Sequence, residues 1–353
     1  MKFEQKHPDY KGGRQIIFNE SAINRIDSLS PCVICKSLTC WFETQFQVHA
    51  CSEECFEYIW KKYYEETGEN PKPYEVVQTI PEERFKIHTD FESECSKNCS
   101  SSWKDILVVV HNQVEYLKIC VDSIRENTKN FNLYIWDNDS DEETKLYLES
   151  LLVEYDLLCA EDAEKDWTIS VTHSDVNLGF IEPNNEMARW GDGKYIILLN
   201  SDTKVFPEWD TTMIGLLESN SNLAQVGCGG GIVDETGKGI DSNMGYEIDF
   251  ISGWCFCISR VTYDRFNLFN NQLEFAYCED SDFSFRLKEA GKQLYAIYSP
   301  LVYHYGNKTI EQVAKDKKDD ILRTFNKNHD YIKNRWESFL RHNRVLSSKV
   351  KFS

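Results

Sequence analysis

The stretch that decides the fold reads YIILLNSDT and spans residues 195–203. Its five apolar residues predict a buried strand, and the change to Asn200, Ser201 and Asp202 puts a carboxylate at the exposed end of that strand. In α/β enzymes such strand ends form the crevice where nucleotides bind. One carboxylate and two nucleotide phosphates could complete the oxygen shell of Mg2+ or Mn2+. The same residues also suit a helix cap or an Asx turn, so the pattern alone leaves both interpretations open.

Short apolar runs alternate with amphipathic segments around this strand. We expect further strands at residues 106–110, 133–136 and 168–172, and helices at residues 115–126 and 142–155. Strands and helices in alternation predict a mainly parallel sheet with helices on both faces. The expected fold class is therefore α/β.

The composition is that of a globular protein, with 353 residues of which 41% are hydrophobic and 13% aromatic. No run of about twenty apolar residues occurs, and the first residues lead into no apolar segment, so the sequence predicts neither a membrane span nor a signal peptide. The 13 cysteines are odd in number and lie mostly in apolar stretches, which favours reduced thiols over a disulfide framework. We therefore expect a cytoplasmic protein.

Charge is distributed unevenly along the chain. The 58 acidic and 39 basic residues give a net charge of −19, which disfavours long-range attraction to nucleic acid or anionic lipid. Residues 315–353 are the exception, with eleven Lys and Arg against five acids. A solvated helical face explains this excess, and a polyanion contact would fall here if one is made.

Composition divides the chain into five expected parts. These are an N-terminal segment at residues 1–30, a cysteine module at 31–66, a Pro- and Ser-rich linker at 67–102, the α/β domain at 103–309, and a basic helical extension at 310–353.

The cysteine module contains two close pairs, Cys32 with Cys35 and Cys51 with Cys55. Positions 51 and 55 are one helical turn apart and share a face. Four thiolates can form the closed tetrahedral shell of structural Zn2+, and so short a segment has too small a core to fold without such a staple. The pattern resembles treble-clef zinc fingers, and reduced or redox-active cysteines are the alternative.

The exact zinc ligands stay open. Cys40 and His49 lie between the two pairs and could replace one ligand. A further pair, Cys95 and Cys99, has no visible partner pair and is left unassigned.

Further motifs accompany Asp202 in a fixed order. They are ILVVVHN at residues 106–112, LYIWDNDS at 133–140, NLGFIEPNN at 177–185, SGWCFCI at 252–258, YCEDSD at 277–282 and PLVYHYG at 300–306. This series resembles family 2 glycosyltransferases of the GT-A fold, especially their rhamnosyltransferase-like branch. The resemblance covers residues 105–306. At residues 181–183 this chain has Ile, Glu and Pro where the family usually has small residues, and this difference leaves the donor preference open.

The resemblance implies roles for individual residues. The nucleotide sugar would be bound by His111, Asn112, Asp137, Asn138, Asn177, Gly179, Phe180, Asn184, Asn200, Ser201 and Asp202, with Asp137 accepting from the base. Asp202 and His304 would ligate Mn2+ or Mg2+, and an imidazole in this shell favours Mn2+. Gly253, Trp254 and Asp282 would line the acceptor side.

The acidic motif supplies the expected catalytic group. Acids in the first turn of a helix also complement its dipole, but Glu279, Asp280 and Asp282 are more than capping requires. By resemblance Asp280 is the general base, and Glu279 and Asp282 shape the acceptor pocket or pair with Arg286, one turn beyond Asp282.

The sequence therefore predicts a metal-dependent inverting glycosyltransferase that uses a UDP-, GDP- or dTDP-sugar. A glycan or lipid-linked sugar is the family's usual acceptor. A protein side chain or a hydroxylated nucleic-acid base, docked by the zinc module or the basic C-terminus, is an alternative, although the net charge disfavours nucleic acid. A non-catalytic adaptor that only binds glycans or nucleotide sugars is the rival function. A sugar nucleotidyltransferase would show a Gly-rich loop after the first strand, where this chain has HNQVE at residues 111–115.

Overall fold

The computed structural model describes residues 102–161, 166–306 and 308–343, six short strands before residue 79, and Glu92. The chain divides into two compact units. One comprises Met1–Ser93 with Tyr298–Pro300, and the other comprises Glu94–Ile297 with Leu301–Ser353.

The described part of the first unit consists of paired strands. β1 (Arg14–Ile17) pairs antiparallel with β6 (Glu75–Gln78), so a strand forms within the segment expected to be a linker. Two shorter antiparallel pairs are β2 (Ser30–Pro31) with β3 (Leu38–Thr39) and β4 (Phe42–Glu43) with β5 (Val48–His49). The four expected zinc ligands, Cys32, Cys35, Cys51 and Cys55, lie outside the described residues, so the zinc site stays a prediction. Cys95 and Cys99 also lie outside the described residues.

The second unit is built around a sheet of seven strands, in the order β17-β12-β16-β10-β7-β8-β9. β16 runs antiparallel to both of its neighbours, and the other neighbouring strands are parallel. This mixed, mostly parallel sheet confirms the predicted α/β class. The strands are β7 (Lys104–Val110), β8 (Phe131–Asn138), β9 (Trp167–Ser174), β10 (Tyr195–Leu199), β12 (Leu223–Gly227), β16 (Cys255–Ser259) and β17 (Gln293–Ala296).

The strands form where the apolar runs predict them. β10 has the predicted bounds and every one of its residues is buried, as expected of a central strand in a sheet covered on both faces. β7, β8 and β9 extend one or two residues beyond the predicted runs.

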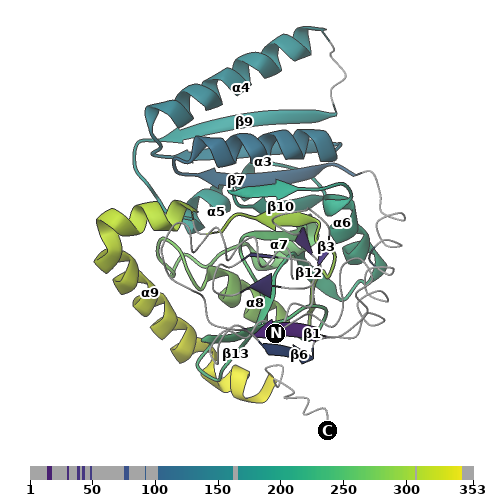
Figure 1. Ribbon diagram of the computed structural model, residues 1–353, viewed down its shortest axis with the longest axis vertical. Helices are drawn as coiled ribbons and strands as arrows, with labels where there is room; N and C mark the ends of the chain where they lie inside the picture. Colours follow the sequence, from purple (N-terminus) through teal and green to yellow (C-terminus); the bar gives the residue numbers. More distant parts are fainter. Residues whose placement is uncertain are drawn as a thin grey trace. The chain divides into compact units, whose positions relative to one another are not determined.

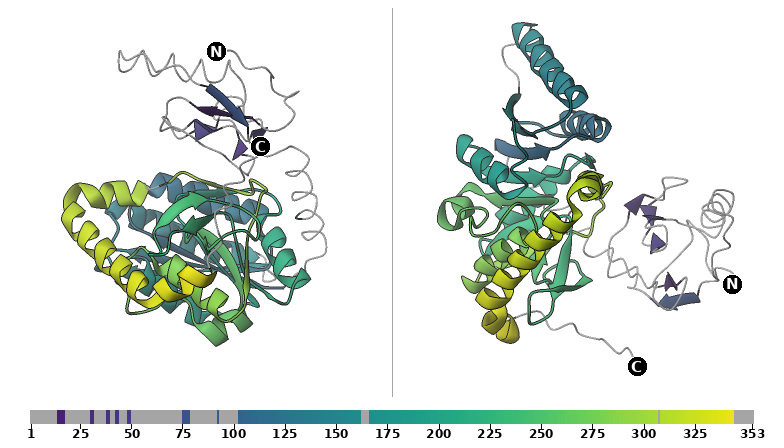
Figure 2. Two further views of the ribbon diagram at one scale, coloured as in Figure 1. Left: turned by 90° about the horizontal axis from the view of Figure 1, so that it is seen from below. Right: turned by 90° about the vertical axis from the view of Figure 1, so that its left-hand side faces the viewer.

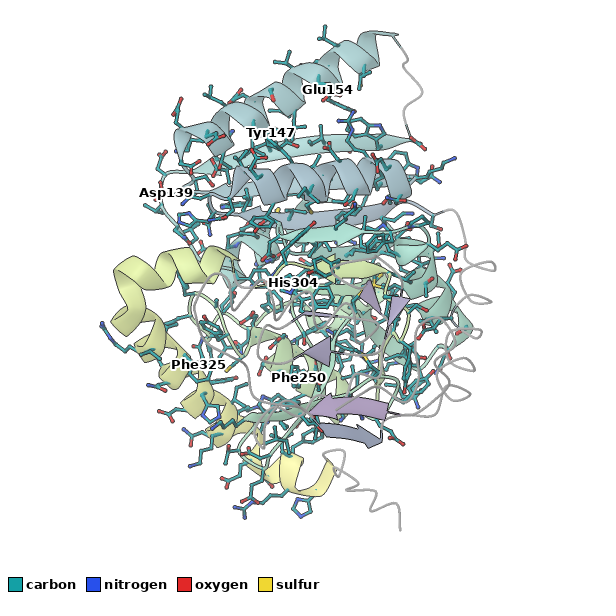
Figure 3. All side chains as sticks on the ribbon, in the orientation of Figure 1. Asp139, Tyr147, Glu154, Phe250, His304 and Phe325 are labelled. Atoms are coloured by element: carbon teal, nitrogen blue, oxygen red, sulfur yellow. The ribbon has the colours of Figure 1, made fainter. Side chains whose placement is uncertain are left out.

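Helices cover both faces of this sheet (Figure 1). They are α3 (Val114–Asn127), α4 (Glu142–Glu161), α5 (Ile181–Trp190), α6 (Trp209–Ser219), α7 (Arg260–Phe266), α8 (Glu279–Glu289) and α9 (Lys308–Asn343). Met187 of α5 and Phe283 of α8 pack in one core cluster with Leu107 of β7. Lys104, on the opposite face of β7, forms a buried ion pair of 2.7 Å with Asp210 of α6. α4 lies against α3, where Glu154 pairs with Arg125 at 2.7 Å (Figure 3).

The C-terminal helix α9 packs against α8 (Figure 2). Its buried face contributes Ile332, Trp336 and Leu340 to a cluster with Phe285 of α8 and Val233. Val233 ends β13 (Gly230–Val233), which pairs with β14 (Gly239–Ser242) and β15 (Phe250–Ile251). α9 thus has a specific place in the core of the second unit. Among the described residues, the structure has no helix with the length and apolar character that crossing a bilayer requires.

Candidate active site

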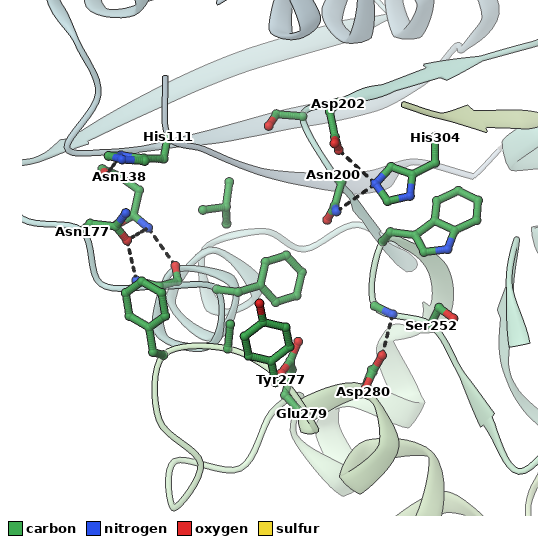
Figure 4. A pocket seen from close by; sticks show the side chains of 18 residues that line it. His111, Asn138, Asn177, Asn200, Asp202, Ser252, Tyr277, Glu279, Asp280 and His304 are labelled. Atoms are coloured by element: carbon green, nitrogen blue, oxygen red, sulfur yellow. Dashed lines mark hydrogen bonds and ion pairs between the residues drawn. The ribbon is translucent and has the colours of Figure 1, made fainter. Parts of the chain in front are cut away.

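A pocket of about 300 Å³ opens at the carboxyl ends of β7, β8 and β10. Chain segments that are far apart in sequence meet there, as expected for a parallel α/β sheet. Most of the site residues predicted from sequence line it (Figure 4), namely His111, Asn138, Asn177, Gly179, Phe180, Asn200, Ser201, Asp202, Gly253, Trp254, Glu279, Asp280 and His304.

One wall of the pocket holds a carboxylate beside an imidazole. Asp202 follows β10, and Nε2 of His304 lies 3.0 Å from its Oδ1. The pair forms because β11 (Thr203–Val205) and β18 (Val302–His304) are antiparallel with Thr203 opposite His304. The His304 ring stacks on Trp254, with 4.9 Å between ring centroids and 10° between planes.

This pair suits a divalent cation. Oxygen from Asp202 and nitrogen from His304 are ligands that Mn2+ accepts, and both atoms meet at the pocket wall. Within the part of the chain that the structure describes, no group of three or more His, Cys, Asp or Glu side chains forms a metal site. Two protein ligands leave positions open for phosphate oxygens, as Mg2+ and Mn2+ sites in nucleotide enzymes require.

Across the pocket, the first turn of α8 presents two acids (Figure 4). Asp280 is oriented by backbone amides: Gly253 donates to its Oδ2 at 3.0 Å and Ser281 donates to its Oδ1 at 2.7 Å. Burial raises the pKa of Asp280, and these two hydrogen bonds oppose that rise.

Glu279 differs from its neighbour. Its side chain is 6% exposed, and among the described residues no group bonds to its Oε2. Burial, followed by the nearby charge of Asp280, raises the pKa of Glu279 to about 8. The raised pKa favours the protonated form of Glu279, and its Oε2 is available to a ligand in the pocket.

The third wall is a network of amide side chains. Asn138 donates to Asn177 Oδ1 at 2.9 Å and to the Gly179 carbonyl at 2.8 Å, while its own Oδ1 accepts from Leu178. His111 Nδ1 lies 2.9 Å from the Asn138 carbonyl oxygen. Gly179 has φ of +78°, and a Cβ there would lie 2.3 Å from the Phe275 carbonyl oxygen. Only glycine fits this position without displacing the backbone.

Four residues expected at the site do not line the pocket; they are Asn112, Asp137, Asn184 and Asp282. The Asp137 carboxylate is fully buried and accepts from Ser140 at 2.9 Å, with His173 Nδ1 at 2.7 Å. In the structure this carboxylate bonds within the protein, and the contact with a nucleotide base that the family resemblance implies stays a prediction. His173 lies opposite Asp137 in the β8–β9 register, which the sequence of β8 alone does not reveal.

The other three residues also serve local structure. The Asn112 side-chain oxygen accepts from the backbone amide of Asp141, and the backbone amide of Asn112 donates to the Ser140 hydroxyl. These bonds shape the loops after β7 and β8. Asn184 donates to the Phe180 carbonyl within the first turn of α5. Asp282 bonds to Arg286 and to Trp336 of α9, so the expected alternative of pairing with Arg286 is the arrangement found.

The structure also adds pocket residues to which the sequence analysis assigned no role, three of them within the quoted motifs. They are Val109, Ser252, Phe275, Ala276 and Tyr277. Val109, Ser252 and Tyr277 belong to quoted motifs, and Phe275 and Ala276 immediately precede the motif at 277–282, so proximity to these motifs was the available sequence signal.

Comparisons with known proteins bear on this site. Residues 105–283, about half of the chain, match the family model described as Glycosyl transferase family 2. No curated protein matches the chain significantly.

Three solved structures with a similar course of the chain are distant from it in sequence. Mannosyltransferase PcManGT from Pyrobaculum calidifontis, in complex with GDP-Man and Mn2+, is 11% identical with a TM-score of 0.44 over 61% of this chain and 63% of its own. GalNAc-T7 with UDP, GalNAc and Mn2+ is 14% identical, with a TM-score of 0.49 over 74% of this chain and 65% of its own. TarS 1–349 of S. aureus is 16% identical, with a TM-score of 0.44 over 70% of this chain and 75% of its own. The chain thus spans less than two thirds of the first two proteins.

Proposed function

This chain belongs to glycosyl transferase family 2, and from that membership we propose that it transfers a sugar from a nucleoside diphosphate sugar to an acceptor hydroxyl. The observation that carries the proposal is a single pocket with Asp202 and His304 on one wall and Glu279 and Asp280 on another. A transferase needs both halves, because one must hold the departing diphosphate and the other must activate the acceptor. A binding module needs no proton acceptor.

Asp202 and His304 are the residues that would hold Mn2+ or Mg2+. A cation there would supply positive charge to offset the charge that builds on the departing nucleoside diphosphate. Stacking on Trp254 keeps the His304 ring from rotating, and the Tyr305 amide donates to the Asp202 carbonyl at 2.9 Å, which fixes the turn.

Asp280 would act as the general base in a direct displacement. The acceptor oxygen forms a bond to the anomeric carbon while the bond from that carbon to the phosphate oxygen breaks, and the acceptor proton passes to Asp280. One such displacement inverts the anomeric carbon. The amides of Gly253 and Ser281 keep the carboxylate aimed during the step.

Glu279 would position a substrate rather than take its proton. The raised pKa favours its protonated form, which can donate a hydrogen bond from the carboxyl group whose Oε2 has no partner among the described residues. A hydroxyl or ring oxygen of a sugar in the pocket could accept this hydrogen bond.

The finer assignment follows the sequence motifs. Asn200, Ser201 and Asp202 occupy the place of the family's Asp-x-Asp motif, and Asn at its first position supports the rhamnosyltransferase-like branch. The donors to test are UDP-, GDP- and dTDP-sugars. We assign the acceptor hydroxyl to a glycan or lipid-linked sugar and the reaction to the cytoplasm. Transfer to a protein or to a hydroxylated nucleic-acid base in a parallel assay would overturn that acceptor assignment.

The test measures release of nucleoside diphosphate from each donor with Mn2+ and with Mg2+. We expect turnover with one donor, and a loss of about a hundredfold or more in Asp202→Ala, since metal interactions contribute several kcal/mol. Asp241→Asn, on the exposed strand β14, is the control and should keep full activity. Donor binding without turnover in the unaltered protein would instead identify a sugar-nucleotide-binding adaptor.

A further inference from the structure

The loop that leads into α8 has an unusual backbone. Phe275, Tyr277 and Cys278 have φ of 59°, 77° and 69°, the left-handed region that non-glycine residues seldom adopt. Such conformations persist only where surrounding contacts hold them. Residues 275–277 line the pocket, and Glu279 and Asp280 follow directly, so the path of this loop sets where the acids point.

A residue of α9 holds this loop. Asn328 is 1% exposed, and its Nδ2 donates to the carbonyl oxygens of Glu274 at 2.9 Å, Ala276 at 3.0 Å and Tyr277 at 3.1 Å. Its Oδ1 accepts from the Glu274 amide at 3.0 Å. One buried side chain thus binds four backbone groups of the same loop, about fifty residues away in sequence.

The loop is tied to the donor side as well. The Phe275 carbonyl accepts from the Phe180 amide at 2.6 Å and the Ile181 amide at 3.2 Å, at the start of α5. The loop therefore lies between the Gly179 segment on one side and Asn328 on the other. A shift of the loop would move the acids relative to the donor wall.

We propose that Asn328 is a positioning residue, which fixes residues 274–277 and thereby aims Glu279 and Asp280 at the substrate. The proposal rests on the proposed glycosyl transfer for its catalytic consequence. Asn328 itself touches no substrate. Asparagine suits the task because one short side chain carries two N–H donors and an acceptor oxygen, whereas a hydroxyl has a single donor and an ionised carboxylate has none.

The helix does not need Asn328 to stay in place. Ile332, Trp336 and Leu340 anchor α9 through the apolar cluster with Phe285. Tyr331, three residues on, accepts a hydrogen bond of 2.7 Å from Asn270 and makes no contact with residues 274–277 among the hydrogen bonds found. Tyr331→Phe is therefore a matched control on the same helix.

The experiment compares Asn328→Leu, Asn328→Asp and Tyr331→Phe in the full chain. Asn328→Asp keeps an acceptor for the Glu274 amide and removes the donors to the carbonyl oxygens of Glu274, Ala276 and Tyr277, so it provides a second variant if the leucine variant fails to fold. In both Asn328 variants we expect kcat for transfer to fall by about ten- to a hundredfold, with KM for the donor within about twofold, because small misplacements of catalytic groups carry such costs. Tyr331→Phe should match the unaltered protein.

Hydrogen exchange provides the readout that does not depend on activity. Amides of residues 273–278 should exchange about tenfold faster or more in the Asn328 variants, with exchange in β7 and β10 unchanged. Unchanged exchange in this loop, or a fall in activity that only tracks a lower folded fraction, would overturn the proposal. Faster loop exchange in a protein that turns over no nucleotide sugar would instead retain the positioning role and reject the proposed function.

Discussion

The three acids in the first turn of α8 show how neighbouring residues of one type come to differ. Asp282 faces the protein and bonds to Arg286 and Trp336. Asp280 faces the pocket and is held by two amides, whereas Glu279 has a buried oxygen without a partner among the described groups. Position on the helix determines which acid stabilises the fold and which is available for chemistry.

Asp280→Asn should lower kcat for transfer by about a hundredfold or more, which is the contribution expected of a general base. The new side-chain amide can accept only one of the hydrogen bonds from Gly253 and Ser281, so part of the loss comes from orientation. Donor affinity should stay within about twofold, since Asp280 does not belong to the Asp202 and His304 wall. Steady-state transfer kinetics and calorimetric nucleotide binding measure the two quantities.

Asp282→Asn is the matched comparison on the same helical turn. It weakens the bond to Arg286 and should lower Tm while leaving kcat of the folded protein nearly unchanged. If this variant lost as much kcat as Asp280→Asn, the assignment of the base to Asp280 would be wrong.

Glu279 should make stability depend on pH. Its pKa is about 8 in the folded chain and near 4.5 when exposed, so between these values the folded state binds more protons than the unfolded state. This contribution is complete below about pH 4.5 and is lost as pH rises through about 8. Thermal melts from pH 5 to pH 9 should show Tm falling more in the unaltered protein than in Glu279→Gln, by roughly 2–4 °C for each kcal/mol removed. Parallel curves for the two proteins would contradict the raised pKa.

At the scale of elements, the register between strands explains what the sequence could and could not predict. The strand at residues 195–199 and the acid after it were predictable, because five apolar residues and an abrupt polar change are local signals. The partnership of Asp202 with His304 depends on the β11–β18 register across about a hundred residues, and only the family resemblance indicated it.

A second register, that between β8 and β9, makes the expectation for Asp137 hard to judge from sequence. A strand-end carboxylate looks alike whether it faces a pocket or a neighbouring strand, and here β9 supplies His173 beside it. Asn328 was invisible for a similar reason, since its four bonds join α9 to a loop about fifty residues earlier.

The loop before α5 yields a prediction about glycine. Gly179→Ala should destabilise the protein by about 1–3 kcal/mol from its positive φ alone. The added Cβ also meets the Phe275 carbonyl at 2.3 Å, so it should disturb the pocket and weaken donor binding. Thermal melts and nucleotide titration test both effects. Gly239→Ala, where nothing lies within 4 Å of the new Cβ, is the control. Equal Tm and equal nucleotide affinity in the two variants would show that neither stability nor donor binding requires the close approach of Gly179 to Phe275.

At the scale of the whole molecule, Glu92 matters for where the chain can be cut. Its buried carboxylate accepts from the amides of Tyr298 at 2.6 Å and Ser299 at 2.8 Å, and the three residues belong to one compact unit. Residues 298–300 lead directly into β18, which carries His304. A boundary chosen by composition at about residue 103 would therefore remove a partner of the segment that precedes a proposed metal ligand.

Two truncations test this boundary. A chain that starts at residue 91 keeps Glu92 and should retain Tm and donor hydrolysis near those of the full chain. A chain that starts at residue 103 leaves the Tyr298 amide without its acceptor and should lose about 1–3 kcal/mol for each buried amide orphaned. Glu92→Ala in the full chain should reproduce much of that loss, measured by thermal melts and by donor hydrolysis with Mn2+. The chain from residue 103 could instead hydrolyse donor at the same rate as the chain from residue 91. Glu92 would then be dispensable for donor hydrolysis, and the catalytic unit would begin at about residue 103, where the composition changes.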